Sequence, residues 1–292
     1  MTLPHTDLDV LLSHLVGDRL DLDAGTLARH LPLLDEVVAT TANGNALISE
    51  LGTYAEPSFT GEAFPVRPDA VTLRLSRPAV ASVVATRADD GRREPAALWL
   101  FDGDGAAVHR AHLLSPDAPL VTEVLRLAPR ADDPPAAPAP GAPDELDHLG
   151  LLDALTDGGG RVPDGLVPAA PPCGVARAVD LLCLLCEHGV PAGLAVPNGG
   201  CLQIGTGSVD HVETGDVVGV VSGPVQFAFA PAEVDAVRPV RTHGPHGPMT
   251  TVLLTAADGR CLALFGQFGL PSTEVVAAWE RMVRDVLLHP IG

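Results

Sequence analysis

The chain has 292 residues, 46% of them hydrophobic, which is enough to bury the cores of two domains of ordinary size. Its 37 acidic and 18 basic residues give a net charge of −19, which repels phosphate groups. Nucleic acid and anionic membrane surfaces are therefore excluded as expected partners. All 18 basic residues are arginines, so Schiff-base chemistry on a lysine is excluded as well.

In chain order, residues 5–35 predict short amphipathic helices, because apolar residues recur there at helical spacing. A β-rich block follows from residue 37 to about 114. β-Branched or aromatic runs predict strands at 71–75, 80–86 and 97–101, and the Asn43-Gly44 and Asp104-Gly105 pairs predict hairpin turns. Residues 120–127 read as a closing helix.

The segment 129–143 is rich in Pro and Ala, cannot sustain regular hydrogen bonding, and predicts an extended linker. Helices are then expected within 144–189, strands from 193 to 264, and a closing helix over 273–288 with Trp279 on its apolar face. Each half thus reads as helices, antiparallel sheet and helix, and the predicted fold class is α+β.

An internal repeat supports this division into halves. Residues 43–53 (NGNALISELGT) return as 198–208 (NGGCLQIGTGS), and residues 98–108 return as 252–262, at offsets of 155 and 154. Two colinear matches at nearly one spacing predict a duplicated domain. The expected organisation is a first copy over 1–128, a linker over 129–143 and a second copy over 144–292.

Histidine is the main candidate for chemistry. His109 follows the Asp104-Gly105 turn on a strand. A histidine in such a position is more often a half-buried structural residue than a ligand. His148 lies at the start of the helix that opens the second copy, at the mouth between the copies, where ligands often bind. A solvent-exposed histidine at a helix start is the alternative for His148.

Other motifs give weaker evidence of a functional site. His243 and His246 stand in a Gly/Pro turn without a further ligand at metal spacing, and Cys183 with Cys186 forms a single CxxC that predicts core packing. Asp102 and Asp104 are better explained by a turn than by a calcium loop. The five cysteines predict reduced thiols, and the start of the chain lacks a basic, apolar leader, so we expect a cytoplasmic protein without membrane insertion.

Several segments resemble the cytoplasmic hemin-utilisation proteins of the hemin-degrading factor or hemin transport family. Residues 98–110 (LWLFDGDGAAVHR) resemble the family's LQFFDxxGxAVHK, and residues 200–209 (GCLQIGTGSV) resemble GCIQIHTGPV. The segments 38–43, 51–54 and 264–267 also match family motifs in the right order. The resemblance covers about residues 30–125 and 190–286.

The resemblance implies two homologous halves, each a large antiparallel sheet flanked by helices, with heme b held in a cleft between them. It implies His148 as the axial ligand of the iron, because His148 is the histidine of the segment that opens the second half. His109 is a further candidate contact, and Arg241 and Arg238 are candidates to pair with the propionates.

The sequence also departs from the family. The histidine of GCIQIHTG is Gly205, the arginine of the MALTRN motif is Ala42, and the arginine that often follows the GQ pair is Phe268. Several polar groups expected around heme are therefore missing.

Three functions follow as hypotheses. The first is a heme-binding protein for heme trafficking and iron acquisition, which exchanges heme with an importer or a downstream heme oxygenase as a monomer or homodimer. The second is a heme-degrading enzyme that opens the ring and releases iron. The third is a non-catalytic scaffold or interaction paralogue that has lost heme.

Overall fold

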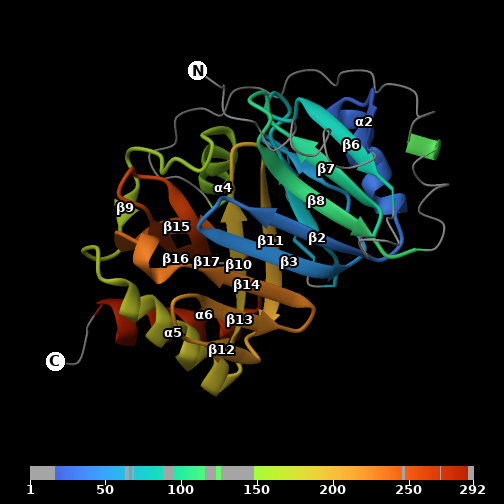
Figure 1. The fold of residues 1–292 in the computed structure, drawn as a ribbon. Coiled ribbons are helices and arrows are strands. Elements are labelled where there is room, and N and C mark those ends of the chain that lie inside the picture. The colour runs from blue at the N-terminus through green and yellow to red at the C-terminus, as the bar shows by residue number, and fades with distance from the viewer. Residues whose placement is uncertain are drawn as a thin grey trace.

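The computed structural model describes residues 17–62, 66–67, 69–87, 95–115, 123–125, 148–244, 247–269 and 271–288. Two large sheets form its frame (Figure 1), and their strands are antiparallel apart from one short parallel pair, β4–β5. The mixed α+β class expected from the sequence is confirmed. The predicted linker lies outside the described residues, so the boundaries of the two copies stay a prediction.

The first sheet has nine strands in the order β1-β6-β7-β8-β2-β3-β14-β13-β12. Their bounds are β1 Gly17–Leu20, β2 Val37–Ala42, β3 Ala46–Gly52, β6 Ser82–Thr86, β7 Ala97–Phe101, β8 Ala107–Leu113, β12 His211–Glu213, β13 Val218–Ser222 and β14 Val225–Phe229. The strands predicted at 80–86 and 97–101 are β6 and β7.

The second sheet has eight strands in the order β4-β5-β11-β10-β17-β16-β15-β9. Their bounds are β4 Ser58–Phe59, β5 Thr72–Leu75, β9 Val167–Pro168, β10 Pro191–Pro197, β11 Cys201–Ser208, β15 Ala236–Gly244, β16 Gly247–Thr255 and β17 Cys261–Gly266. The strand predicted at 71–75 is β5.

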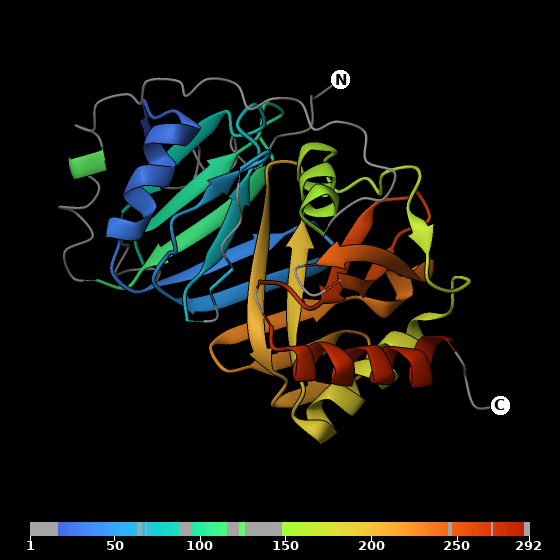
Figure 2. The same ribbon diagram turned by 180° about the vertical axis from the view of Figure 1, so that it is seen from behind.

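Helices cover these sheets on three sides. They are α2 (Ala24–His30) with the 3₁₀ turn η1 (Leu31–Leu33), α4 (His148–Asp157), α5 (Val175–His188), the 3₁₀ turn η2 (Pro231–Glu233), and α6 (Thr273–Val283), which continues into the π-helical turn η3 (Arg284–Leu288). Viewed from behind, α2 lies against the first sheet, and α6 runs beside α5 below the second (Figure 2). The fully buried Trp279 of α6 confirms the predicted apolar face.

One expectation for the N-terminal segment is wrong. Residues 17–20 were expected to be helical but form β1, which pairs antiparallel with β6 and extends the edge of the first sheet. A free sheet edge offers backbone hydrogen bonds that override the weak local preference of so short a segment. Residues 5–16 lie outside the described residues, as does most of the helix expected at 120–127, of which 123–125 are helical.

The repeat is visible in the backbone. Gly105 and Gly259 both have a positive φ, 79° and 81°, in turns that join equivalent strands. The register of each hairpin shifts at equivalent places, between Leu100 and Phe101 and between Leu254 and Thr255, an offset of 154 residues. Glycine is suited to both turns because it adopts a left-handed conformation without strain.

The two copies exchange strands. By the repeat offset, β5 of the first copy is equivalent to β14 of the second, yet β5 pairs with β11 in the second sheet, and β14 pairs with β3 in the first. The registers match as well, because Leu73 lies opposite Gln203 and Phe227 lies opposite Ile48. Each sheet therefore contains strands of both copies, which the sequence pattern did not predict.

Two equivalent asparagines fasten the copies together. The Asn43 amide nitrogen donates to the carbonyls of Pro197 and Leu262 at 2.9 and 2.8 Å. The Asn198 amide nitrogen donates to the carbonyls of Ala42 and Val108 at 2.9 and 2.6 Å. Each asparagine and its two acceptors correspond to the other asparagine and its acceptors at an offset of 154 or 155 residues. The arrangement is thus reciprocal, as in the self-complementary interface of a two-fold dimer.

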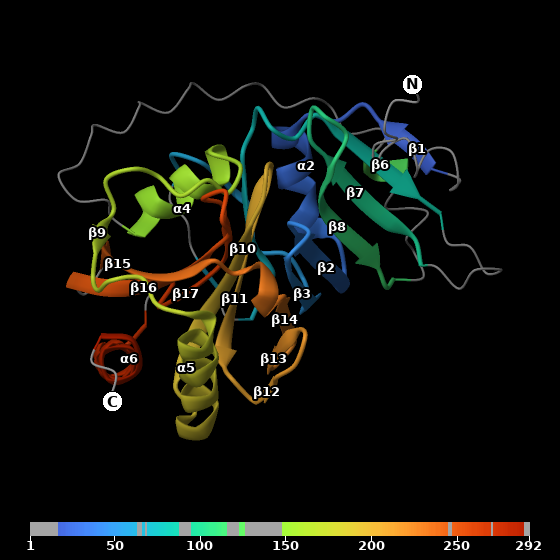
Figure 3. The same cartoon turned by 60° about the vertical axis from the view of Figure 1, so that its left-hand side comes forward.

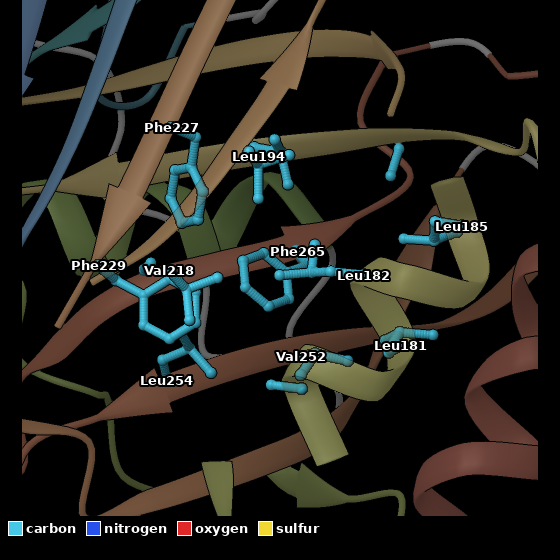
Figure 4. Packing of buried hydrophobic residues seen from close by; sticks show 14 of the residues in the cluster. Leu181, Leu182, Leu185, Leu194, Val218, Phe227, Phe229, Val252, Leu254 and Phe265 are labelled. Carbon is cyan, nitrogen blue, oxygen red and sulfur yellow. The ribbon is translucent and has the colours of Figure 1, made fainter. Parts of the chain in front are cut away.

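The main core lies between the two sheets and α5 and α6. Phe227 and Phe229 of β14 face Phe265 of β17 with ring centroids 5.7 and 6.4 Å apart (Figure 4). Leu194, Val252 and Leu254 surround these rings. The opposite face of the second sheet, with Ala195, Leu253 and Leu264, packs instead against α4. Figure 3 shows α4 on one side of this sheet and α5 and α6 on the other. The second sheet therefore separates two environments.

Candidate functional site

The site suggested by the sequence is centred on α4. Its buried residues Leu151, Leu152 and Leu155 pack on the face of the second sheet that carries Val240 and Leu253. His148 is the first residue of this helix, and residues three and four positions apart share a helix face. The apolar stripe that seats α4 therefore also directs His148 toward the sheet.

The imidazole of His148 is held by two threonines. Its Nδ1 lies 3.0 Å from the Thr242 hydroxyl and 3.5 Å from that of Thr251, and the two hydroxyls are 3.2 Å apart. Both threonines are buried on adjacent strands, β15 and β16. A hydrogen bond at one ring nitrogen fixes the orientation of the ring, and a histidine that ligates a metal is usually held in this way through its other nitrogen.

A buried ion pair anchors the same helix. The guanidinium of Arg74, on β5, is fully buried and pairs with Asp153 of α4. Asp153 also accepts a hydrogen bond from the Gly61 amide at 2.9 Å, and Ser76 donates to Asp157 at 3.0 Å. Burial lowers the pKa of Arg74 and raises that of Asp153, because desolvation disfavours both charged forms. The exchanged strand β5 thus holds the helix that carries His148.

Sequence reasoning missed Arg74. The available signal was an arginine between Leu73 and Leu75 in the strand predicted at 71–75, because a charge among apolar neighbours requires a partner if the strand is buried. Its partner on α4 is 79 residues away in sequence, and no local pattern indicates it.

Beside His148 the second sheet lacks side chains at two positions, and Phe268 fills the resulting gap in the side-chain layer. Gly193 of β10 and Gly266 of β17 are paired neighbours, so this part of the sheet carries no side chains. The ring of Phe268 occupies the space. A Cβ atom built on Gly193 would come within 2.0 Å of Phe268 Cδ2, and one on Gly266 within 3.4 Å of its Cζ. The Phe268 ring centroid is 4.8 Å from that of His148.

The structure separates the two candidate arginines. Arg241 pairs with Glu280 of α6 at 3.1 Å, so it lies on the α6 face of the second sheet, opposite to His148. Arg238 lies on the same face as Thr242, since side chains alternate along a strand, and it donates to Thr255 at 3.2 Å. Four residues along β15 place Arg238 about 13 Å from Thr242.

His109 lies in the core between the sheets. Its Nδ1 is 2.8 Å from the Thr41 hydroxyl, its Nε2 is 2.7 Å from the Tyr54 hydroxyl, and 2% of its surface is exposed. Burial lowers its pKa to about 3, with a smaller contribution from the Arg110 charge. Both ring nitrogens of a neutral imidazole are therefore engaged by the protein, and the geometry agrees with the structural reading of this residue.

A second polar pair lies in the same inter-sheet core. Glu50 is 3% exposed and receives a hydrogen bond from the side chain of Gln203, which is fully buried. Desolvation raises the pKa of Glu50 to about 7, against the weaker opposing effect of this hydrogen bond. Its carboxyl group is thus largely protonated below neutral pH.

The three departures from the family motifs lie in different places. Gly205 faces Val225 of the exchanged strand β14, and a Cβ there would come within 2.6 Å of that side chain. Ala42 lies at the turn beside Asn198, to which its carbonyl is bonded. Of the three, Phe268 is the one that contacts His148.

Two hollows in the described residues do not include His148. One of about 340 Å³ is lined by the loop 162–172 together with Arg238, Val240 and Thr255. The other, of about 420 Å³, lies where the Asn43-Gly44 and Asn198-Gly199 turns of the two copies meet. The hollow between the copies is thus separate from His148, the predicted axial ligand. The surroundings of His148 are formed by α4 and the second sheet.

The remaining motifs have structural surroundings. Cys183 and Cys186 are half-buried on α5, and Cys186 packs against the main core. His243 is the residue before the last of β15, and His246 lies outside the described residues. Within the described part of the chain, no three His, Cys, Asp or Glu side chains are grouped to hold a metal ion. No described helix has the length and apolarity needed to cross a membrane.

Comparisons with known proteins bear on this site. Residues 12–120 match the model of the haemin-degrading HemS.ChuX domain. None of the curated proteins matches the chain in sequence.

Two solved structures share the fold over nearly the whole chain. ChuS, an E. coli heme oxygenase, superposes with a TM-score of 0.72 at 18% identity, covering 95% of this chain and 90% of its own. Holo-PhuS, a heme-binding protein from Pseudomonas aeruginosa, gives 0.69 at 19% identity, with 94% and 88% covered. The large antiparallel sheets thus agree with the fold that the sequence motifs implied.

Proposed function

We propose that this chain, a member of the hemin-degrading HemS/ChuX family of heme-utilisation proteins, is a cytoplasmic heme-binding protein with His148 as the axial ligand of the iron. The observation that carries the proposal is the setting of His148. Its Nδ1 is held 3.0 Å from Thr242, at the start of a helix anchored by a buried ion pair.

The residues around His148 suit a heme in most respects. An imidazole held at Nδ1 presents Nε2 to a metal, and the surrounding face of the second sheet is apolar at Val240, Leu253 and Leu264. The paired glycines 193 and 266 leave a flat area of backbone, which Phe268 fills in this conformation. Heme b, when bound, supplies the redox-active iron and the planar macrocycle.

For the propionates, Arg238 is the better of the two candidate partners. It shares the face of the sheet with Thr242 and lines a hollow, whereas Arg241 is engaged by Glu280 on the other face. Removing Arg238 should therefore weaken heme binding more than removing Arg241 does, since only the former lies on the ligand's side.

We favour a carrier over a degrading enzyme. Ring opening requires hydrogen-bond donors that steer oxygen at the iron, and the family arginine that follows the GQ pair is here Phe268, against His148. As a carrier, the chain would exchange heme with an importer or with a downstream heme oxygenase. Reduction of the heme complex followed by exposure to oxygen should return intact heme, whereas a degrading enzyme would give bilin absorbance and free iron.

The test of binding is a heme titration of the purified chain followed by its Soret band. We expect saturation at one heme per chain and loss or displacement of the band in His148→Ala. The control is His188→Ala, which changes an exposed histidine at the end of α5 and should leave the titration unchanged. Absence of a Soret shift at micromolar heme would refute the proposal and favour a scaffold that has lost heme.

A further inference from the structure

The ring of Phe268 lies against both His148 and the two glycines of the second sheet. We propose that Phe268 controls access to His148: its ring occupies the place that a planar ligand must take, and the ligand binds only when this ring swings away. The inference deepens the proposed function and rests on it for the identity of the ligand. The control of access itself concerns only Phe268, His148 and the sheet beneath them.

The first argument is the shape of the sheet. The strand registers place Thr206, Gly193 and Gly266 in one row across β11, β10 and β17, and a Cβ on Gly266 would stand 3.5 Å from the Thr251 hydroxyl of β16. Two neighbouring glycines in this row leave a gap in the layer of side chains, and glycine inside a strand often marks the close approach of another group. The ring of Phe268 is that group, in contact distance of both glycine positions.

The second argument is the contact with His148. The two ring centroids are 4.8 Å apart at an interplanar angle of 52°, and 6% of Phe268 is exposed. The Nε2 atom of His148 is itself shielded from solvent in this conformation. A planar molecule that approaches the sheet beside His148 therefore meets Phe268 first.

The third argument is the position of Phe268 in the chain. It lies two residues beyond the end of β17, after Gln267, whose side chain donates to the Pro191 carbonyl at 2.7 Å. Gly269 follows with a φ of 80°. The strand is thus fixed up to Gln267, while Phe268 is followed by a conformationally permissive glycine. Rotation about the Cα–Cβ bond of Phe268 would therefore move its ring out of the gap over the two glycines without disturbing the sheet.

The purely structural reading makes a different prediction. If Phe268 only fills the core, its removal should lower stability and leave the reactivity of His148 as it was. If it controls access, its removal should increase the reactivity of His148 even when no heme is present, and should speed heme binding. A population of open molecules of about a tenth would give a gain of roughly tenfold when the ring is removed.

The experiment compares Phe268→Ala with the wild-type chain. Carbethoxylation of His148 by diethyl pyrocarbonate, read peptide by peptide by mass spectrometry, reports access without heme. Stopped-flow mixing with heme reports the association rate. The matched control is Phe227→Ala, which also removes a buried ring, here from the main core on the other side of the second sheet. We expect roughly tenfold faster modification and association in Phe268→Ala and no change in Phe227→Ala.

A second variant reaches the same state from the sheet. Gly193→Ala introduces a methyl group 2.0 Å from the Phe268 ring, which forces this ring out of the gap beside His148. It should also accelerate carbethoxylation of His148, and it provides the test if Phe268→Ala does not fold.

The outcomes separate the two proposals. Unchanged modification of His148 in both folded variants overturns the control of access, even if heme binds. Faster modification without a Soret shift in any variant supports the control of access and overturns heme as the ligand.

Discussion

Two histidines in this chain occupy opposite kinds of surroundings. In the inter-sheet core, His109 is 2% exposed and bonded at both ring nitrogens, to Thr41 and Tyr54. On the α4 face of the second sheet, His148 is bonded to Thr242 at Nδ1 and lies against an aromatic ring. The difference shows that a histidine identifies a candidate site only together with the groups that surround its ring. Four predictions test this contrast.

The largest effect is expected at the anchor of α4. Asp153→Ala leaves the fully buried Arg74 without its counter-ion and should cost about 3–5 kcal/mol of unfolding free energy, because an uncompensated buried charge is strongly destabilising. Urea denaturation measures it. Asp258→Ala, which removes an exposed pair with Arg260, is the control and should change nothing measurable. A loss below about 1 kcal/mol in Asp153→Ala would contradict the role of the ion pair.

The second prediction concerns pH and the inter-sheet core. The pKa of Glu50 is raised from 4.5 to about 7, so the folded state holds this proton more tightly than the unfolded state. Stability should therefore fall as pH rises through this interval. Glu50→Gln removes the ionisation and should be more stable than the wild type by about 3 kcal/mol at pH 8 and by a few tenths at pH 4. Equal differences at both pH values would show that Glu50 does not titrate in this interval.

The third prediction exchanges the two histidines as targets. His109→Ala leaves two buried hydroxyls without their partner and should cost about 2 kcal/mol or more, while heme titration of the folded variant stays unchanged. His148→Ala should do the reverse. The Thr242 and Thr251 hydroxyls, 3.2 Å apart, can still bond each other, so the loss of stability is smaller, while the Soret band of the complex is lost or displaced. Thermal unfolding and heme titration of both variants measure this. Loss of heme binding in folded His109→Ala would place the site in the inter-sheet core instead.

The smallest effect compares the two copies. Asn43→Ala and Asn198→Ala each remove a pair of hydrogen bonds between copies, at about 1–2 kcal/mol. Asn198 is 7% exposed, whereas Asn43 is half-buried, so water can replace the lost bonds more easily in Asn43→Ala. Denaturant titration should give the larger loss for Asn198→Ala. Equal losses would mean that the reciprocal contacts are also energetically symmetric.

Much of the framework was predictable because it rests on local patterns. The strand over 97–101 was predicted at its observed bounds from apolar and aromatic residues, and both hairpin turns followed from Asn-Gly and Asp-Gly pairs. The buried face of α6 followed from helical spacing around Trp279. Residues 17–20 were mispredicted because a free edge of the sheet, and not the local sequence, decides the conformation of such a short segment.

The candidate site was predictable only in part. The family motifs pointed to His148, and the substitution by Phe268 was noted as a departure. Sequence spacing does not show that the two rings touch, since they are 120 residues apart. The choice between Arg241 and Arg238 as propionate partner could not be made from the sequence. Alternation along a strand places the two on opposite faces, but which of these faces carries His148 depends on where α4 packs.

The duplication and the hairpin turns follow from the sequence alone, because they depend on repeated local patterns and on glycines within a few residues of each other. Only the tertiary structure decided that β5 and β14 change places between the sheets. Duplication makes the two strands equivalent, so each offers the same pattern to either sheet, and the choice depends on contacts made across the whole chain. The same long-range contacts bring Arg74 to α4 and Phe268 to His148.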